Sequence, residues 1–461
     1  MRGLMEDKKL FLKKLVSLVL PITFQQFMLA VVSASDAIML GALSQDSMSA
    51  VSLAGQVQFV FNLFLWGITA GTSIFAAQYW GKGDKDTVER LLGIVYRVTV
   101  PVSMLFSIFT LAIPSELMSI FTNERTLIDY GAEYLRTVSL SYLLCGLSQI
   151  YLCIMKNSGR AFMSSLISSV CVLINILFNA LFIFGLIGFP KLGIAGAAIA
   201  TVIARAAELV WALCDSIKKN RIKIRPKYFI AIDKELRRKF WKYTLPVLGN
   251  QFVWGLGFTM GTVIIGRLGP DAIAANSIAN IAKNLAVCFC TGVASGGGIL
   301  VGNELGAGNL ERAKIFGNKI CKMSVISGII TGLILLALSP LIRMFAKLTP
   351  QADEYLKWMF FICAYYLVGK SINGTTIGGI FCAGGDSKFG LICDTVTLWA
   401  VVVPLGLIAA FVLKLPVMAV YFVINLDEII KLPAVFRHYR KYNWLKDLTV
   451  RPEYSTLKPA G

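Results

Sequence analysis

Residues 21–41, PITFQQFMLAVVSASDAIMLG, form an apolar segment that carries a single acidic residue, Asp36. A helix of about 20 apolar residues can cross a bilayer, so this segment is long enough to span one. A charged side chain at the centre of a membrane helix costs roughly 2.5–3.5 kcal/mol on insertion scales, and it usually has a function. Asp36 is therefore either a functional acid inside the membrane or an acid solvated near the membrane–water boundary.

The composition indicates that the whole chain is a membrane protein. Of its 461 residues, 56% are hydrophobic and 15% are charged, and the mean hydropathy is +0.69. Soluble domains are about a quarter charged, so we predict an all-α, polytopic membrane protein without a separate soluble domain. Twelve transmembrane helices are predicted, at residues 13–41, 49–79, 92–114, 127–154, 163–188, 193–218, 238–266, 275–304, 316–341, 352–381, 389–413 and 416–437.

Basic residues are concentrated in every second loop between these helices. The two termini and the even-numbered loops are basic, the odd-numbered loops are poor in Lys and Arg, and the third loop is acidic. The positive-inside rule places both termini and the even loops in the cytoplasm of a multi-pass protein of the inner (cytoplasmic) membrane. Basic loops beside lipid headgroups account for the net charge of +19, so no nucleic-acid partner is predicted.

The sequence repeats itself at an offset of 225 residues. Leu20–Pro21 matches Leu245–Pro246, because 246 − 21 = 225, and the glycine pair within 81–83 matches the pair within 306–308 without gaps. Duplicated six-helix halves are typical of transporters whose substrate site lies between the repeats. We therefore predict two six-helix bundles with this division: N-terminal bundle 1–216, basic cytoplasmic linker 217–242, C-terminal bundle 243–440 and cytoplasmic tail 441–461.

The repeat also bears on Asp36. At the same offset Asp36 falls on Gly261, because 36 + 225 = 261, so only the N-terminal half carries the acid. A requirement of the fold would act in both halves. The comparison therefore favours a functional role for Asp36.

Cysteine and histidine form no metal-binding or catalytic pattern in this sequence. The ten cysteines include no CxxC pair, most of them lie in or beside apolar runs, and His438 lies in the basic C-terminal region. Cysteines in such positions are usually buried free thiols. The sequence therefore predicts no metal site, no cofactor and no enzymatic activity.

Four stretches, taken together, resemble the multidrug and toxic compound extrusion (MATE) family. They are SASDAIMLGALSQDSMSAVSLA (33–54), AAQYWGKGDKDTVERLLG (76–93), NILFNALFIFG (175–185) with LGIAGAAIATVIAR (192–205), and FCAGGDSKFGLICD (381–394). The resemblance implies two six-helix bundles in a V shape, a central cavity, and efflux driven by inward movement of H⁺ or Na⁺.

The resemblance also implies a cation-coupling site in the N-terminal bundle. Its first-helix acid matches Asp36, its fifth-helix asparagine matches Asn175, and a sixth-helix threonine matches Thr201. The family's fifth-helix acid is replaced by Asn179, which a spacing of four places on the same helix face as Asn175. One carboxylate instead of two weakens Na⁺ binding and favours H⁺. Hydrogen bonding between helices is the structural alternative for the two asparagines.

Polar and aromatic residues within the apolar segments are candidates for the central substrate cavity, namely Gln26, Gln58, Gln251, Trp254, Lys283 and Lys370. In the cavity, Lys283 and Lys370 would disfavour cationic substrates or bind anionic ones, whereas snorkelling lysines would reach headgroups instead. Some MATE proteins use carboxylates on helices seven and ten, where Trp254 and Ser371 stand here, which argues against a second, C-terminal cation site. Asp394 and Glu428 are expected to brace helix ends.

These observations predict a secondary active transporter that exports organic compounds, often cationic and amphipathic, in exchange for H⁺ or Na⁺ by alternating access. A lipid-linked precursor flippase of the same superfamily is the alternative within transport, and a channel is the alternative from another class. The expected partners are small-molecule substrates and the lipid bilayer, and the expected state is a monomer. The physiological substrate stays open, because such cavities are broad and mostly apolar.

Overall fold

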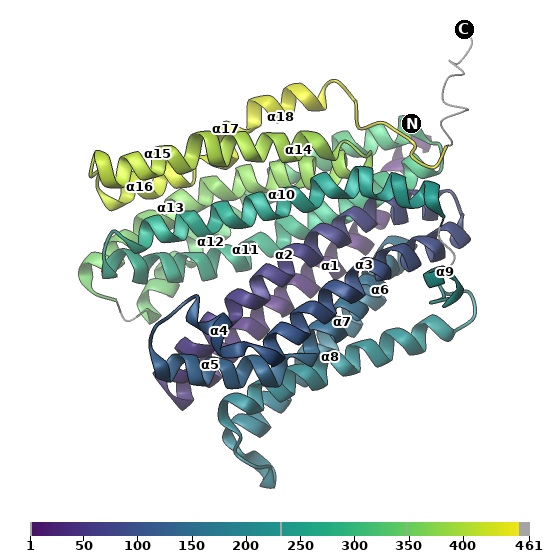
Figure 1. The fold of residues 1–461 in the computed structure, drawn as a ribbon. Coiled ribbons are helices and arrows are strands. Elements are labelled where there is room, and N and C mark those ends of the chain that lie inside the picture. Colours follow the sequence, from purple (N-terminus) through teal and green to yellow (C-terminus); the bar gives the residue numbers. More distant parts are fainter. Residues whose placement is uncertain (1, 231–232, 347, 451–461) are drawn as a thin grey trace. The chain divides into compact units, whose positions relative to one another are not determined.

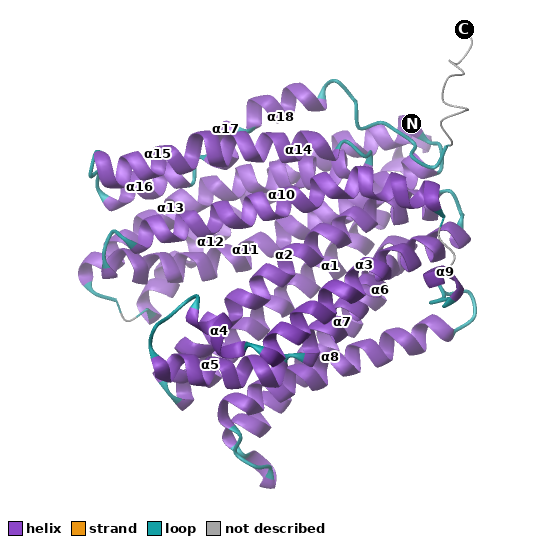
Figure 2. Ribbon diagram, viewed as in Figure 1, coloured by secondary structure: helices purple, strands orange, loops and turns teal. Residues whose placement is uncertain are grey.

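The computed structural model describes residues 2–230, 233–346 and 348–450. These residues form helices joined by short loops and contain no strand (Figure 1, Figure 2). The prediction of an all-α fold is therefore confirmed.

Ten long helices make up most of the described chain. They are α1 (Arg2–Leu43), α2 (Gln45–Gly81), α3 (Lys85–Ala112), α6 (Leu140–Met155), α7 (Ala161–Phe184), α8 (Gly193–Ile217), α10 (Lys234–Gly266), α11 (Pro270–Gly306), α12 (Leu310–Phe345) and α13 (Pro350–Asn373). Shorter helices are α4 (Pro114–Ser119), α5 (Arg125–Val138), α9 (Lys227–Ile230), α14 (Ser387–Asp394), α15 (Val403–Leu407), α16 (Val417–Ile424), α17 (Asp427–Ile430) and α18 (Leu432–Tyr439). The described chain also has four π-helical segments. Lys156–Arg160 lies between α6 and α7, and Gly374–Phe381, Thr395–Val402 and Ile408–Val412 continue α13, α14 and α15.

The described helices account for the twelve predicted crossings. Nine stretches of the described chain are long and apolar enough to span a membrane, and one of them, Leu140–Phe184, has 45 residues. Gly159 has a φ of 73° within that stretch and separates α6 from α7, so the stretch supplies two crossings. The predicted crossings 352–381 and 416–437 lie in α13 with its π-helical extension and in α16–α18, which carry more charged residues.

The chain folds into two compact units. Unit 1 consists of Met1–Gln26, Ser73–Asp84 and Phe240–Gly461, and unit 2 consists of Phe27–Thr72 and Lys85–Lys239. Each unit is thus assembled from segments that are separate in the sequence, whereas the predicted halves are continuous, and the division into bundles and linker stays a prediction. Residues 231–232 of the predicted linker lie outside the described residues.

The described part of the predicted tail packs within unit 1. Trp444 is completely buried and lies against Gly317 and Gly384. Gln78 Nε2 donates to the backbone oxygens of Ala383 and Lys446, at 2.7 and 3.1 Å. These contacts fix the segment after α18 on the helices of unit 1. The rest of the predicted tail, 451–461, lies outside the described residues.

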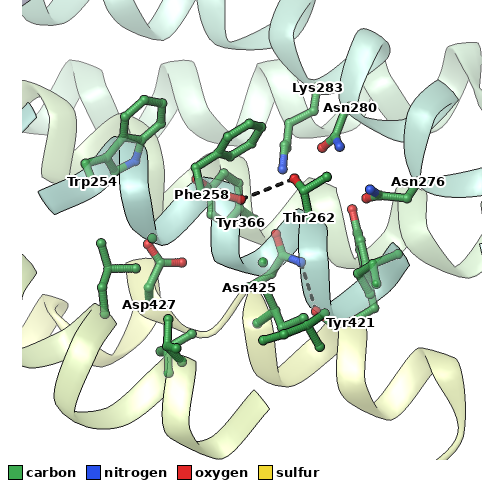
Figure 3. A pocket seen from close by; sticks show the side chains of 18 residues that line it. Trp254, Phe258, Thr262, Asn276, Asn280, Lys283, Tyr366, Tyr421, Asn425 and Asp427 are labelled. Carbon is green, nitrogen blue, oxygen red and sulfur yellow. Dashed lines mark hydrogen bonds between the residues drawn. The ribbon is translucent and has the colours of Figure 1, made fainter. Parts of the chain in front are cut away.

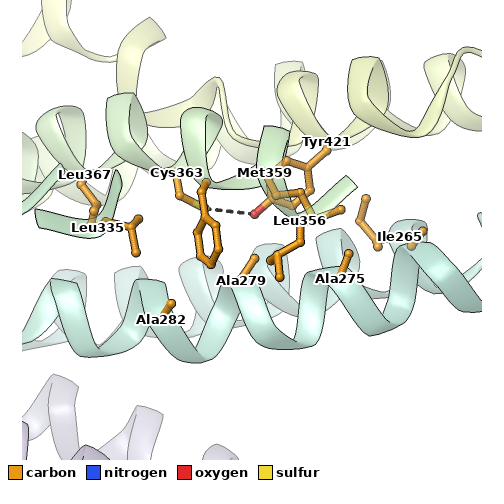
Figure 4. Packing of buried hydrophobic residues seen from close by; sticks show 12 residues of the cluster. Ile265, Ala275, Ala279, Ala282, Leu335, Leu356, Met359, Cys363, Leu367 and Tyr421 are labelled. Atoms are coloured by element: carbon orange, nitrogen blue, oxygen red, sulfur yellow. Dashed lines mark hydrogen bonds between the residues drawn. The ribbon is translucent and has the colours of Figure 1, made fainter. Parts of the chain in front are cut away.

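A buried cluster between α11 and α13 forms part of the core of unit 1 (Figure 4). The α11 side contributes small residues, namely Ala272, Ala275, Ala279 and Ala282. Small side chains on one face let two membrane helices approach closely. The α13 side contributes larger residues, and Cys363 lies 3.2 Å from the hydroxyl of Tyr421 in α16. This packing fixes Lys283, which directly follows Ala282.

Candidate functional site

Asp36 lies in the part of α1 that belongs to unit 2, where its side chain is partly buried. Its Oδ1 accepts a hydrogen bond of 2.5 Å from Nδ2 of Asn179 in α7. Within the described chain, no lysine or arginine forms an ion pair with Asp36. The carboxylate is therefore held by an amide and lacks a basic counter-ion there.

The hydrogen bonding continues from Asn179 to α8. Asn179 Nδ2 also donates to Asn175 Oδ1 at 3.1 Å, and Asn175 Nδ2 donates to Thr201 Oγ1 at 3.2 Å. The Thr201 hydroxyl donates to the backbone oxygen of Ala197 at 3.0 Å. The structure thus brings together the four residues that the sequence placed in a cation site. Their part in ion coupling stays a prediction.

The oxygens around Asp36 suit a proton or a small hard cation. Asn175 and Asn179 are buried, and Asn179 Oδ1 has no hydrogen-bond partner in the described structure. Buried polar atoms in proteins are nearly always paired, so an unpaired amide oxygen next to a carboxylate marks a place for a further group. Tyr134 of α5 lies beside this group, near Thr201 and near enough to Asp36 to interact with its charge.

The α7–α8 hairpin positions the two asparagines against Thr201. Helix α7 ends at Phe184, and the φ of 70° at the following Gly185 turns the chain. The backbone N–H of Leu192 then donates to Phe182 O at 2.8 Å. A Cβ at Gly196 would lie 2.8 Å from the Phe182 backbone. Only glycine therefore lets α8 approach α7 this closely, which brings Thr201 within reach of Asn175.

Other buried acids of unit 2 are paired in ways that Asp36 is not. Glu208 of α8 is fully buried, and it binds Arg205 at 2.9 Å and the hydroxyls of Ser148 and Ser168, each at 2.8 Å. Asp215 binds Arg160 at 2.5 Å. These acids are neutralised and join α6, α7 and α8, which is a structural role.

A cavity in unit 1 is lined by residues of α10, α11 and α13 and of the segments 398–403 and 421–427 (Figure 3). Its empty space is about 660 Å³, part of it open to solvent. The aromatic rings of Trp254 and Phe258 stack at 5.8 Å along α10. The charged residues of its lining are Lys283, which is 8% exposed, and Asp427, which is 4% exposed.

The structure separates the residues that the sequence assigned to a substrate cavity. Trp254 and Lys283 line the cavity of unit 1, whereas Gln26, Gln58, Gln251 and Lys370 are not part of its lining. Lys370 lies 4.8 Å from the Trp254 ring and forms an ion pair of 3.2 Å with Glu428. Gln58 instead donates to Asn62 at 3.0 Å. The assignment of these six residues to one substrate cavity stays a prediction.

A buried charge network in unit 1 was missed by the sequence reasoning. Lys431 Nζ lies 2.9 Å from Asp394 Oδ1, 3.2 Å from Glu428 Oε2 and 3.6 Å from Asp427 Oδ2. Asp394 and Glu428 do lie at helix ends, as the last residue of α14 and in the first turn of α17, and both are buried and bind Lys431. The spacing of Asp427, Glu428 and Lys431 at three and four residues in an apolar segment was the available signal.

Comparison with known proteins identifies the class to which this fold and these sites belong. The profile of the family described as MatE matches residues 21–181 and 246–408. The two matches begin 225 residues apart, at the offset of the internal repeat. The chain belongs to the MatE family, whose members are membrane transporters and not enzymes.

Several proteins resemble the chain over nearly its full length. The "Uncharacterized transporter YisQ" of Bacillus subtilis is 24% identical over 94% of this chain and 95% of its own length. The "Probable multidrug resistance protein NorM" of Thermotoga maritima is 23% identical over 86% of this chain and 85% of its own. A MOP superfamily transporter from Pyrococcus furiosus superposes with a TM-score of 0.85 at 17% identity, over 94% of this chain and 95% of its own. At that identity the superposition supports the fold alone.

Proposed function

We propose that the protein exports small organic molecules in exchange for H⁺ or Na⁺ by alternating access, and that Asp36 is the carboxylate that binds the coupling ion. The observation that carries the proposal is the partly buried Asp36, which is held by Asn179 in the described structure without a basic counter-ion. Membership of a family of multidrug efflux transporters supports the direction of transport. The names of the relatives do not favour the flippase alternative.

The local chemistry favours H⁺ as the coupling ion. A single carboxylate beside neutral amide and hydroxyl oxygens supplies one negative charge, which one proton neutralises completely. The protonated acid also gains an O–H donor, and Asn179 Oδ1 is a buried acceptor without a partner in the described structure. Ion binding and substrate binding are coupled only if they favour different conformations of the protein.

The orientation and assembly of the protein are also part of the proposal. The basic termini and even-numbered loops support a multi-pass protein of the inner membrane with both termini in the cytoplasm. A monomer is consistent with the solved structures that match the chain as single chains. No cofactor is needed for such transport beyond the coupling ion.

Efflux from proteoliposomes tests the proposal. The vesicles contain a fluorescent organic cation or a fluorescent carboxylate, and pH and Na⁺ gradients are applied separately to the wild type and to Asp36→Asn. We expect one gradient to drive saturable efflux in the wild type, and the variant to lose that response while staying folded. Asp46→Asn, which changes an exposed acid at the start of α2, is the matched control and should pump normally. Normal efflux by Asp36→Asn, or conductance without exchange, would contradict the proposal.

A further inference from the structure

Lys283 is a buried cation that has no polar partner in the described part of the chain. It is 8% exposed, and no hydrogen bond or ion pair joins its Nζ to another described residue. An ammonium group has three N–H donors, and burying them without acceptors is costly. The side chain does not snorkel to the surface; it points from α11 into the cavity of unit 1 (Figure 3).

Two aromatic rings lie next to Lys283, and a buried charge network is in its neighbourhood. Its Nζ lies 4.9 Å from the ring of Tyr366 and 6.0 Å from the ring of Phe258, and such ring faces attract cations. The neighbouring network holds the three acids Asp394, Asp427 and Glu428 but two lysines, Lys370 and Lys431. A charge on Lys283 therefore brings these six groups to neutrality, without any of the acids lying in ion-pair contact with it.

The cavity combines this cation with a surface for a flat apolar body. Trp254 and Phe258 stack with an angle of 19° between their rings, so they present neighbouring aromatic faces. Asn276, Asn280 and Lys283 recur at spacings of four and three, which places two amides on the same face of α11 as the ammonium. Asp427 also lines the cavity, but its carboxylate faces Lys431 at 3.6 Å, which offsets its repulsion of an anion.

We propose that this cavity binds aromatic carboxylic acids, with the carboxylate accepting hydrogen bonds from Lys283 and the ring lying against Trp254 and Phe258. The statement that these acids are transported substrates rests on the proposed function, whereas the binding site does not. Asp36 belongs to unit 2 and is not part of the cavity. Asp36→Asn should therefore keep the cavity's preference for an anionic over a neutral ligand.

Equilibrium dialysis of the detergent-purified protein against three probes with the same ring tests the proposal. The probes are 2-naphthoate, the neutral 2-naphthamide and the cationic 2-naphthylmethylammonium, at pH 7.5. A charge-assisted contact predicts that the wild type binds 2-naphthoate about tenfold or more tightly than the amide. Lys283→Met should remove this preference and Lys283→Arg should keep most of it. Lys322→Met removes an exposed lysine of α12 and should change nothing.

The wild-type comparison keeps the test decisive even if Lys283→Met fails to fold. Equal binding of the three probes, a preference for the cation, or no binding of 2-naphthoate would overturn the proposal. So would a folded Lys283→Met protein that retains the anion preference. Loss of ion-driven efflux in Asp36→Asn with intact naphthoate binding would leave both proposals standing. Normal efflux by Asp36→Asn with naphthoate binding would remove the coupling role alone.

Discussion

Replacing Lys431 by methionine should destabilise unit 1 more than the same replacement of Lys370 or Lys322. The change keeps the length and most of the volume of the side chain but leaves Asp394, Asp427 and Glu428 with one base, Lys370, which contacts only Glu428. Lys431 is 3% exposed, so water cannot replace its ammonium group. Removing one partner of a buried ion pair costs about 3–5 kcal/mol, and three acids place this variant in the upper part of that range.

Two other lysine-to-methionine variants should lose less unfolding free energy than Lys431→Met. Lys370→Met breaks one contact of 3.2 Å at a side chain that is 23% exposed, so we expect a loss of about 1–3 kcal/mol. Lys322→Met changes an exposed side chain and should cost within about 0.5 kcal/mol. Adding Asp394→Asn to Lys431→Met should recover part of the loss, because it removes one of the stranded negative charges.

Two measurements report this order. Titration with a denaturing detergent gives the free energy of unfolding, and a thiol-reactive fluorophore follows heating, since nine of the ten cysteines are buried free thiols. The expected order of stability is wild type, Lys322→Met, Lys370→Met, Lys431→Met. The reasoning is refuted if Lys431→Met is as stable as Lys322→Met. It is also refuted if Asp394→Asn lowers the stability of Lys431→Met by as much as it lowers the stability of the wild type.

Two further predictions concern the Asp36 site. Asn179→Asp places a second carboxylate beside Asp36 and should make efflux depend on Na⁺, measured as transport against Na⁺ concentration at fixed pH; unchanged ion dependence would contradict the role of this amide. Gly196→Val forces a side chain against the Phe182 backbone, where a Cβ already comes within 2.8 Å. We expect a loss of about 1–3 kcal/mol in unfolding free energy and weaker coupling, whereas Gly55→Ala in open space should be tolerated.

Features that repeat along the chain could be predicted from the sequence. The apolar lengths and the alternation of loop charge define the crossings, and the offset of 225 residues defines the duplication, which the family match reproduces. The spacing of four between Asn175 and Asn179 placed both on one face of α7, where they do hydrogen-bond each other.

Features that depend on which helices face each other could not be predicted in this way. Asp394 ends α14 and Lys431 lies 37 residues later between α17 and α18, so no periodicity links them. The repeat likewise does not predict the division into two units. The first part of α1 and the last part of α2 belong to the same unit as segments from much later in the sequence. Hydropathy records that a residue is buried, but not which residue it meets.

The repeat offset relates the two candidate sites to each other. Asp36 corresponds to Gly261, which lines the cavity of unit 1 and has no side chain to fill it. Gln58 corresponds to Lys283, because 58 + 225 = 283, so the second helix of each half carries an amide in one copy and a cation in the other. At each of these two positions, the charged residue of one half is thus matched by an uncharged residue in the other half. One half holds an acid without a base and the other holds a base without hydrogen-bonded or ion-paired partners, both within the described residues. A cation and an organic anion would then bind to different units, so their exchange would be coupled through the conformations that each ligand favours and not through competition for one site.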